Sequence, residues 1–173
     1  RPDVGGEFFQ WFNFRLSGQI GEQYVLNILN AGEASYLEGW ENYQAVASYD
    51  RQEWFRVPSH YDGQELVIEH CPEHDSVYYA YFAPYSWERH QDLISWAQLS
   101  PLCQLECLGQ TLDGHDLDLL ISSDATATAT PKRTIWITAR QHPGEAMAEW
   151  FVEGLLGRLL DPSDPHARLL LQQ

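Results

Sequence analysis

The sequence predicts a two-part fold, with an antiparallel β-sandwich over residues 1–84 followed by the start of an α/β domain over residues 85–173. In the first part, short segments rich in aromatic and β-branched residues alternate with turn residues, and no helical spacing interrupts them. In the second part, helical patterns flank a continuous apolar run, "TIWITA". Such a run is typical of a strand buried on both faces of a parallel sheet, so we expect a mixed sheet with flanking helices.

The β-rich part contains five strand-like segments. They cover residues 8–18, 21–32, 43–57, 64–71 and 76–84. The Asp62-Gly63 pair is a hairpin-turn signal between the third and fourth segments. Segments this short, spaced this closely, favour two packed antiparallel sheets.

The second part begins with a helix signal. Ser86 is a suitable N-cap, and bulky residues then recur at helical spacing through residue 98. Two strands follow over residues 102–123, joined by a turn at Asp113-Gly114. Near the end, Asp164 and Pro165 have the residue types preferred at the cap and first position of another helix.

The helix after "TIWITA" carries the most informative stretch, "ITARQHPGEAMAEWF" at residues 137–151. Pro143 fits the first helical position, and Glu145 would then lie in the first turn, where a carboxylate complements the helix dipole. An apolar face is predicted for this helix, formed by Met147, Trp150, Phe151, Leu155 and Leu159.

Composition restricts the function classes. The formal net charge of −15 disfavours nucleic acid and anionic membranes as partners. No apolar run approaches the roughly 20 residues that span a bilayer, and the first residues lack the apolar core of a signal peptide. The three cysteines are too few for a disulfide scaffold, so we expect reduced thiols and a cytoplasmic location.

His142 and Glu145 allow two interpretations. Helix-start preferences alone account for Pro143 and Glu145, and a lone histidine is more often structural than a ligand. However, ligands bind beyond the carboxyl ends of strands in α/β sheets, and His142 comes three residues after the apolar run. An imidazole nitrogen and a carboxylate oxygen three residues apart also suit zinc.

The stretch "ARQHPGEAMAEWF" resembles the first zinc-binding motif of the zinc carboxypeptidases, in the cytosolic carboxypeptidase branch, which carries His-Pro-Gly-Glu at this place. "YFAPYSWERHQDLISWAQ" resembles the segment that opens the family's catalytic domain, and "LGQTLDGHDLDLLI" resembles its early β-hairpin. The β-rich part is similar to the N-terminal β-sandwich of the cytosolic branch. The resemblance therefore covers nearly all 173 residues.

This resemblance implies that His142 and Glu145 are two of three protein ligands to one catalytic zinc ion. The third ligand, a histidine, and the general base, a glutamate, are expected downstream of residue 173. The implied reaction is metal-assisted hydrolysis at a peptide or protein C-terminus, with acidic glutamate tails as one expected substrate. Because the ligand set would be incomplete, we expect these residues alone to be inactive.

One position departs from the digestive members of the family. They carry an arginine between the zinc-binding histidine and glutamate, whereas this sequence has Gly144, as in the cytosolic branch. Arg140, two residues before His142, is therefore a candidate for contacting substrate or for a supporting salt bridge.

Two alternatives stay open at this point. Aspartoacylase- and desuccinylase-type zinc amidohydrolases share the His-x-x-Glu motif and act on small acyl-amino acids, although the β-sandwich and the Pro-Gly pair argue against them. A non-catalytic module that binds sugars or peptides through the aromatic-rich β-sandwich is the second alternative. Its aromatic residues would then be exposed rather than packed in a core.

Overall fold

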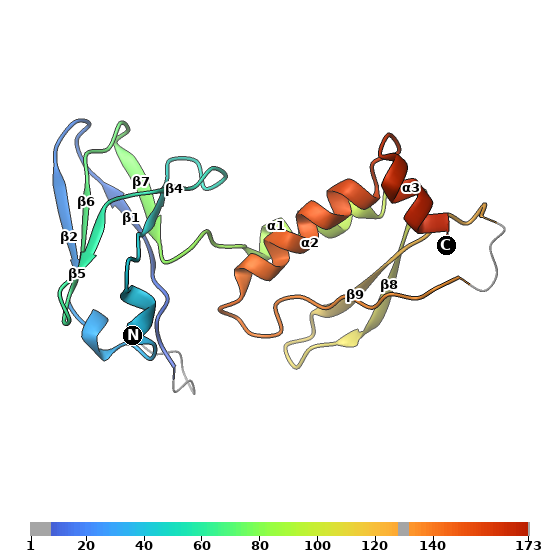
Figure 1. Cartoon of the computed structure of the whole chain (residues 1–173), viewed down its shortest axis with the longest axis horizontal. Helices are drawn as coiled ribbons and strands as arrows, with labels where there is room; N and C mark the ends of the chain where they lie inside the picture. The colour runs from blue at the N-terminus through green and yellow to red at the C-terminus, as the bar shows by residue number, and fades with distance from the viewer. Residues whose placement is uncertain (1–7, 128–131, 173) are drawn as a thin grey trace. The chain divides into compact units, whose positions relative to one another are not determined.

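The computed structural model describes residues 8–127 and 132–172. The chain divides into two compact units, Arg1–Pro84 and Tyr85–Gln173, each described by itself below (Figure 1).

In the first unit, residues 8–84 form two antiparallel sheets (Figure 1). One sheet has the order β1-β7-β3-β4, and its strands are Asn13–Ser17, Ser76–Ala80, Val46–Ser48 and Phe55–Arg56. The other has the order β2-β6-β5, and its strands are Tyr24–Ile28, Leu66–His70 and Ser59–Tyr61. Each of the five predicted segments contributes at least one of these strands, which confirms the β-sandwich.

The core of this unit is aromatic and aliphatic. Tyr79 in β7 and Leu66 and Ile68 in β6 are fully buried, because alternate residues of a strand point to the same face. Two short 3-10 helices, η1 (Ala31–Glu33) and η2 (Leu37–Trp40), follow β2, and the sequence did not predict them. They place the buried Trp40 side chain in the core, where its Nε1 donates to the Ala31 carbonyl at 3.0 Å.

In the second unit, residues 85–127 and 132–172 form three helices and a hairpin (Figure 1). Helix α1 covers Trp87–Ala97, and the Ser86 hydroxyl accepts a hydrogen bond from the Arg89 backbone N–H, as expected of an N-cap. Strands β8 (Cys103–Gln110) and β9 (Asp116–Ser122) form the predicted hairpin. Its turn requires a positive φ of 79° at Gly114, a conformation that glycine adopts without steric cost.

The last two helices are α2 (Ala146–Leu159) and α3 (Pro165–Gln172). Asp164 caps α3 as predicted, because its Oδ1 accepts hydrogen bonds from the backbone N–H groups of His166 and Ala167. Helix α2 begins three residues later than predicted. Residues 143–144 form a turn instead, and the Glu145 backbone N–H donates to the His142 carbonyl at 3.0 Å.

Two further expectations for this unit differ from the structure. The run at residues 134–139 forms no strand, and its Ile135 and Trp136 are 69% and 65% exposed. No described strand pairs with it, because β8 and β9 pair only with each other. The apolar face predicted for α2 is correct only in part. Trp150, Leu155 and Leu159 are half-buried, whereas Met147 and Phe151 are exposed and the buried leucine of the helix is Leu156. The mixed sheet thus stays an expectation, because the sheet described in this unit is an antiparallel hairpin.

All three cysteines are free, in agreement with reduced thiols. Within the described ranges, no helix has both the length and the apolar character required to cross a bilayer.

Candidate metal centre

His142 and Glu145 lie in the short turn that leads into α2. Glu145 is the N-cap residue of α2, and the hydrogen bond from its backbone N–H to the His142 carbonyl closes the turn. Pro143 and Gly144 occupy its middle, where a Cβ added to Gly144 would meet no atom within 4 Å. The turn therefore brings residues three apart in sequence to the same side of the helix start.

The two side chains point at one another. His142 Nδ1 lies 3.0 Å from Glu145 Oε1, and the His142 backbone N–H donates to Glu145 Oε2 at 3.4 Å. Hydrogen bonding from the His142 side chain lowers the pKa of the Glu145 carboxyl, so this carboxylate is ionised at neutral pH. Both side chains are accessible, with 76% of His142 and 47% of Glu145 exposed.

This geometry fits two ligands of a zinc ion. Zinc–nitrogen and zinc–oxygen distances of about 2.1 Å at tetrahedral angles place the two donor atoms about 3.4 Å apart. The 3.0 Å between Nδ1 and Oε1 is close to this spacing, and both groups have the required chemistry, an imidazole and an ionised carboxylate. Among the described residues, no group of three or more His, Cys, Asp or Glu side chains is arranged to hold a metal ion.

Three of the other six histidines have well-defined polar contacts elsewhere. The His70 ring in the β-sandwich lies 2.8 Å from the Tyr79 hydroxyl, and the His166 ring lies beside Asp164 at the start of α3. His90 on α1 lies near the turn but contacts Glu149 and Asp118 rather than His142 or Glu145.

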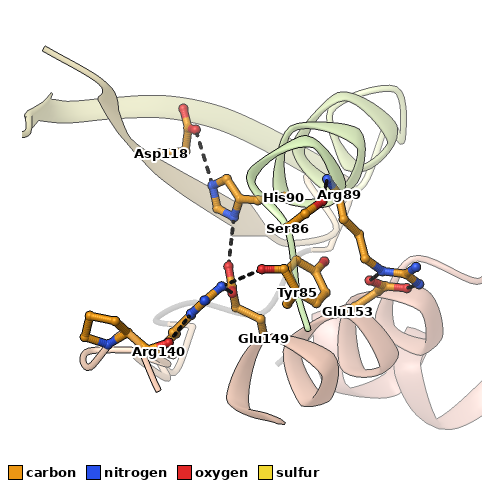
Figure 2. Close-up of polar contacts among 9 residues, drawn as sticks. Tyr85, Ser86, Arg89, His90, Asp118, Arg140, Glu149 and Glu153 are labelled. Atoms are coloured by element: carbon orange, nitrogen blue, oxygen red, sulfur yellow. Dashed lines mark hydrogen bonds and ion pairs between the residues drawn. The ribbon is translucent and has the colours of Figure 1, made fainter. Parts of the chain in front are cut away.

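The Arg140 side chain folds back onto the protein (Figure 2). Its Nη1 donates to the Tyr85 carbonyl at 2.8 Å and contacts the Glu149 carboxylate, and its Nε donates to the Pro143 carbonyl at 3.2 Å. The supporting salt bridge is thus present, whereas direct contact between Arg140 and substrate stays a prediction.

Glu149 is the residue that the sequence analysis missed. It lies on α2 one turn after Glu145, is only 15% exposed, and joins Arg140 to His90 (Figure 2). The His90 Nδ1 lies 3.3 Å from Glu149 Oε1, and its Nε2 lies 3.9 Å from Asp118 Oδ2 on β9. The signal that could have found Glu149 is its four-residue spacing from Glu145, which places the two carboxylates on one helix face.

A second ion pair joins the same two helices. Arg89 on α1 binds Glu153 on α2 with its Nε at 2.8 Å and its Nη2 at 2.5 Å (Figure 2). The Arg89 guanidinium also lies 4.0 Å from the centre of the Trp150 ring, and Trp150 packs edge-on against Tyr85. These contacts hold α2 against α1 without touching the turn.

Comparison with protein families decides the identity. The model of the cytosolic carboxypeptidase N-terminal domain matches residues 1–82, and the model of the zinc carboxypeptidases matches residues 93–173. The chain belongs to the zinc carboxypeptidase family. Its β-sandwich assigns it to the cytosolic carboxypeptidase-like branch of that family.

Two relatives match nearly the whole of this chain. An uncharacterised protein of Zymomonas mobilis is 43% identical over 99% of the chain and 43% of its own length. Cytosolic carboxypeptidase 6 of the mouse is 29% identical over 98% of the chain and 35% of its own length. The chain thus spans less than half the length of these relatives.

Solved structures agree with this assignment. A metallo-carboxypeptidase from Burkholderia cenocepacia is 49% identical with a TM-score of 0.93, covering all of this chain and 46% of that one. A metallo-carboxypeptidase from Pseudomonas aeruginosa, in complex with (2-guanidinoethylmercapto)succinic acid, is 40% identical with a TM-score of 0.89, again covering all of this chain and 46% of that one.

Proposed function

We propose that the protein is a zinc-dependent metallocarboxypeptidase in which His142 and Glu145 supply two of the three protein ligands. The observation that carries this proposal is the convergence of His142 Nδ1 and Glu145 Oε1 at 3.0 Å on an accessible turn. The family implies the zinc ion, and the two side chains fit it in chemistry and spacing.

These residues would contribute binding and orientation to the reaction. A zinc ion bound here would lower the pKa of a water molecule toward about 7 and polarise the scissile carbonyl. His142 would bind through Nδ1 in the tautomer that carries its hydrogen on Nε2, so the hydrogen that Nδ1 donates to Glu145 would move to the other ring nitrogen. The ionised Glu145 carboxylate would offer one oxygen, so neither a neutral His142 ring nor Glu145 would lose a proton overall. The exposure of both side chains leaves room for a peptide C-terminus to approach.

The site needs a third ligand and a general base, which we propose lie beyond residue 173. Residues 1–173 alone are therefore expected to release no C-terminal residues when zinc is added, because two ligands do not complete a catalytic site. Turnover by these residues at the rate of the full-length protein would contradict this part of the proposal.

The zinc assignment is tested by metal content. In the full-length protein, His142→Ala should abolish stoichiometric zinc and peptidase activity together. His166→Ala is a matched control, since His166 is also an exposed histidine beside a carboxylate at a helix start, and it should retain both. Full zinc occupancy in the His142→Ala protein would refute the assignment.

The substrate is proposed to be a peptide or protein C-terminus, with acidic glutamate tails as the specific hypothesis. The cytosolic carboxypeptidase relatives support the general class, and their name also supports a cytoplasmic location. The net charge of −15 opposes an acidic substrate at long range, so glutamate selectivity would require local positive charge at the site. Comparison of kcat/KM for peptides ending in Glu and in Leu tests this hypothesis, which equal values would contradict.

A further inference from the structure

We propose that Glu149, acting through Arg140, is a positioning residue that sets the zinc-binding geometry of His142 and Glu145. This inference rests on the proposed function, because it assumes that these two side chains bind zinc. It assigns to Arg140 an action through the turn rather than a contact with substrate.

The two ligands depend on the turn for their orientation. Apart from each other, His142 and Glu145 make no side-chain hydrogen bond within the described part of the chain, and both are largely accessible. Packing therefore does not fix their positions. The backbone of residues 140–145 therefore sets the positions and directions from which the two side chains can reach one zinc ion.

Arg140 fixes that backbone from inside the turn. Its φ of 49° lies in the left-handed region, which is unfavourable for a residue with a side chain and persists only where the surroundings hold it. The guanidinium supplies this restraint, because it donates to the Pro143 carbonyl within the turn and to the Tyr85 carbonyl before α1. The fork of N–H groups on arginine allows these bonds to form together, which a lysine ammonium would not reproduce.

Glu149 in turn holds Arg140. Its carboxylate binds the Arg140 guanidinium through Oε2 and faces the His90 ring through Oε1, so it ties the turn to both α1 and α2. Beyond His90, the Asp118 carboxylate lies 3.9 Å from the ring and extends the contacts to β9 (Figure 2). Since Glu149 is only 15% exposed, water weakens its interaction with Arg140 less than it weakens a surface ion pair.

The test is the zinc dissociation constant of the full-length protein, measured by competition with a chromophoric chelator. Residues that orient metal ligands typically change metal affinity about 10- to 100-fold when replaced. Glu149→Gln and Arg140→Gln should each raise the zinc Kd by about this factor, and Arg140→Lys should recover only part of the loss. The visible spectrum of the cobalt-substituted protein should also change, since it reports ligand geometry rather than stability.

Glu153→Gln is the matched control. Glu153 lies one turn further along α2 and binds an arginine of α1, but it does not contact the turn. This variant should lower thermal stability and leave the zinc Kd and the cobalt spectrum unchanged.

The outcomes separate this inference from the proposed function. If His142→Ala retains zinc, the proposed function fails. If His142→Ala loses zinc but Glu149→Gln and Arg140→Gln bind it as tightly as the wild type, the positioning role is overturned. A rise in KM for Arg140→Gln at unchanged zinc Kd would also overturn it, in favour of direct substrate contact.

Discussion

The two units obtain their stability in different ways. The β-sandwich surrounds its own core, in which Tyr79, Leu66 and Ile68 are fully buried and Trp40 contacts the Tyr43 and Tyr81 rings. The described part of the second unit instead exposes many large apolar side chains, including those of Ile135, Trp136, Ile137, Met147, Phe151, Leu169 and Leu170.

Helix caps and ion pairs are correspondingly more prominent in the second unit. Ser86 and Asp164 cap two of its helices, and Arg89 and Arg140 each bind a glutamate of α2. Partly exposed ion pairs and caps each contribute about 1 kcal/mol, whereas a fully buried side chain contributes several times more. Among the described residues, the largest fully buried side chains thus lie in the first unit, whereas the second unit adds caps and ion pairs to a smaller buried set that includes Ile94, Leu156 and Leu171.

The largest expected effect is loss of a core side chain in the β-sandwich. Leu66→Ala should lower the free energy of unfolding of the first unit by about 2–5 kcal/mol, because it opens a cavity at a fully buried position. Leu99→Ala in the second unit is the control, with a residue that is 81% exposed, and should change stability by less than about 0.5 kcal/mol. Residue-resolved hydrogen exchange under denaturant measures both. Equal losses of unfolding free energy for Leu66→Ala and Leu99→Ala would contradict the importance of the buried core in the first unit.

A smaller effect is expected at a helix cap of the second unit. Ser86→Ala should cost about 1 kcal/mol, because the Arg89 backbone N–H at the start of α1 loses its acceptor. Ser86→Asp should preserve stability, since aspartate is an equally good cap. Thermal unfolding of the two variants provides the comparison, and identical midpoints would argue against a stabilising cap.

The pH dependence should also differ between the units. Burial lowers the pKa of His70 below its ordinary 6.5, so folding disfavours its charged form. The stability that neutral His70 provides is present above about pH 6.5 and declines as the pH falls toward the folded-state pKa. Hydrogen exchange of β6 should therefore accelerate on acidification, and His70→Gln should reduce this dependence.

The contribution of Asp164 to the stability of α3 should change in a lower pH range than that of His70. Hydrogen bonds from Arg158 and from the backbone N–H groups of Ala167 and His166 lower its pKa from 3.8 to about 2. Its contribution is present above about pH 4 and is lost as the pH falls through 2. The stability of the start of α3 should thus not change in the pH range where protonation of His70 already destabilises β6. Asp164→Asn should remove the loss of α3 stability at low pH. A common midpoint for both regions would contradict the assignment.

Local patterns in the sequence predicted much of this architecture. Alternation and turn residues indicated the β-sandwich, and the Ser86 and Asp164 caps were confirmed. The strand predicted at residues 134–139 failed because an apolar run forms a strand only where another strand supplies hydrogen bonds. The start of α2 was placed too early because Pro143 suits a turn as well as a first helical position.

The candidate site was predictable only in part. His142 and Glu145 are three residues apart, so spacing alone could suggest that they converge. The contacts of Arg140, Glu149 and His90 join a turn and two helices that are distant in sequence, and no local pattern reports such contacts. Met147 and Phe151 are apolar residues at helical spacing, and this spacing predicted that they would be buried. Spacing alone, however, does not show which face of α2 packs against the rest of the protein.

Gly144 has a consequence for how this turn can change during evolution or by design. Its φ lies outside the left-handed region, and a Cβ placed on it meets no described atom within 4 Å. Glycine is therefore not required there by backbone conformation or by crowding among the described residues. A single codon change could install a charged side chain between the two proposed zinc ligands at little folding cost. The charge beside the two proposed zinc ligands is thus open to change by a single mutation.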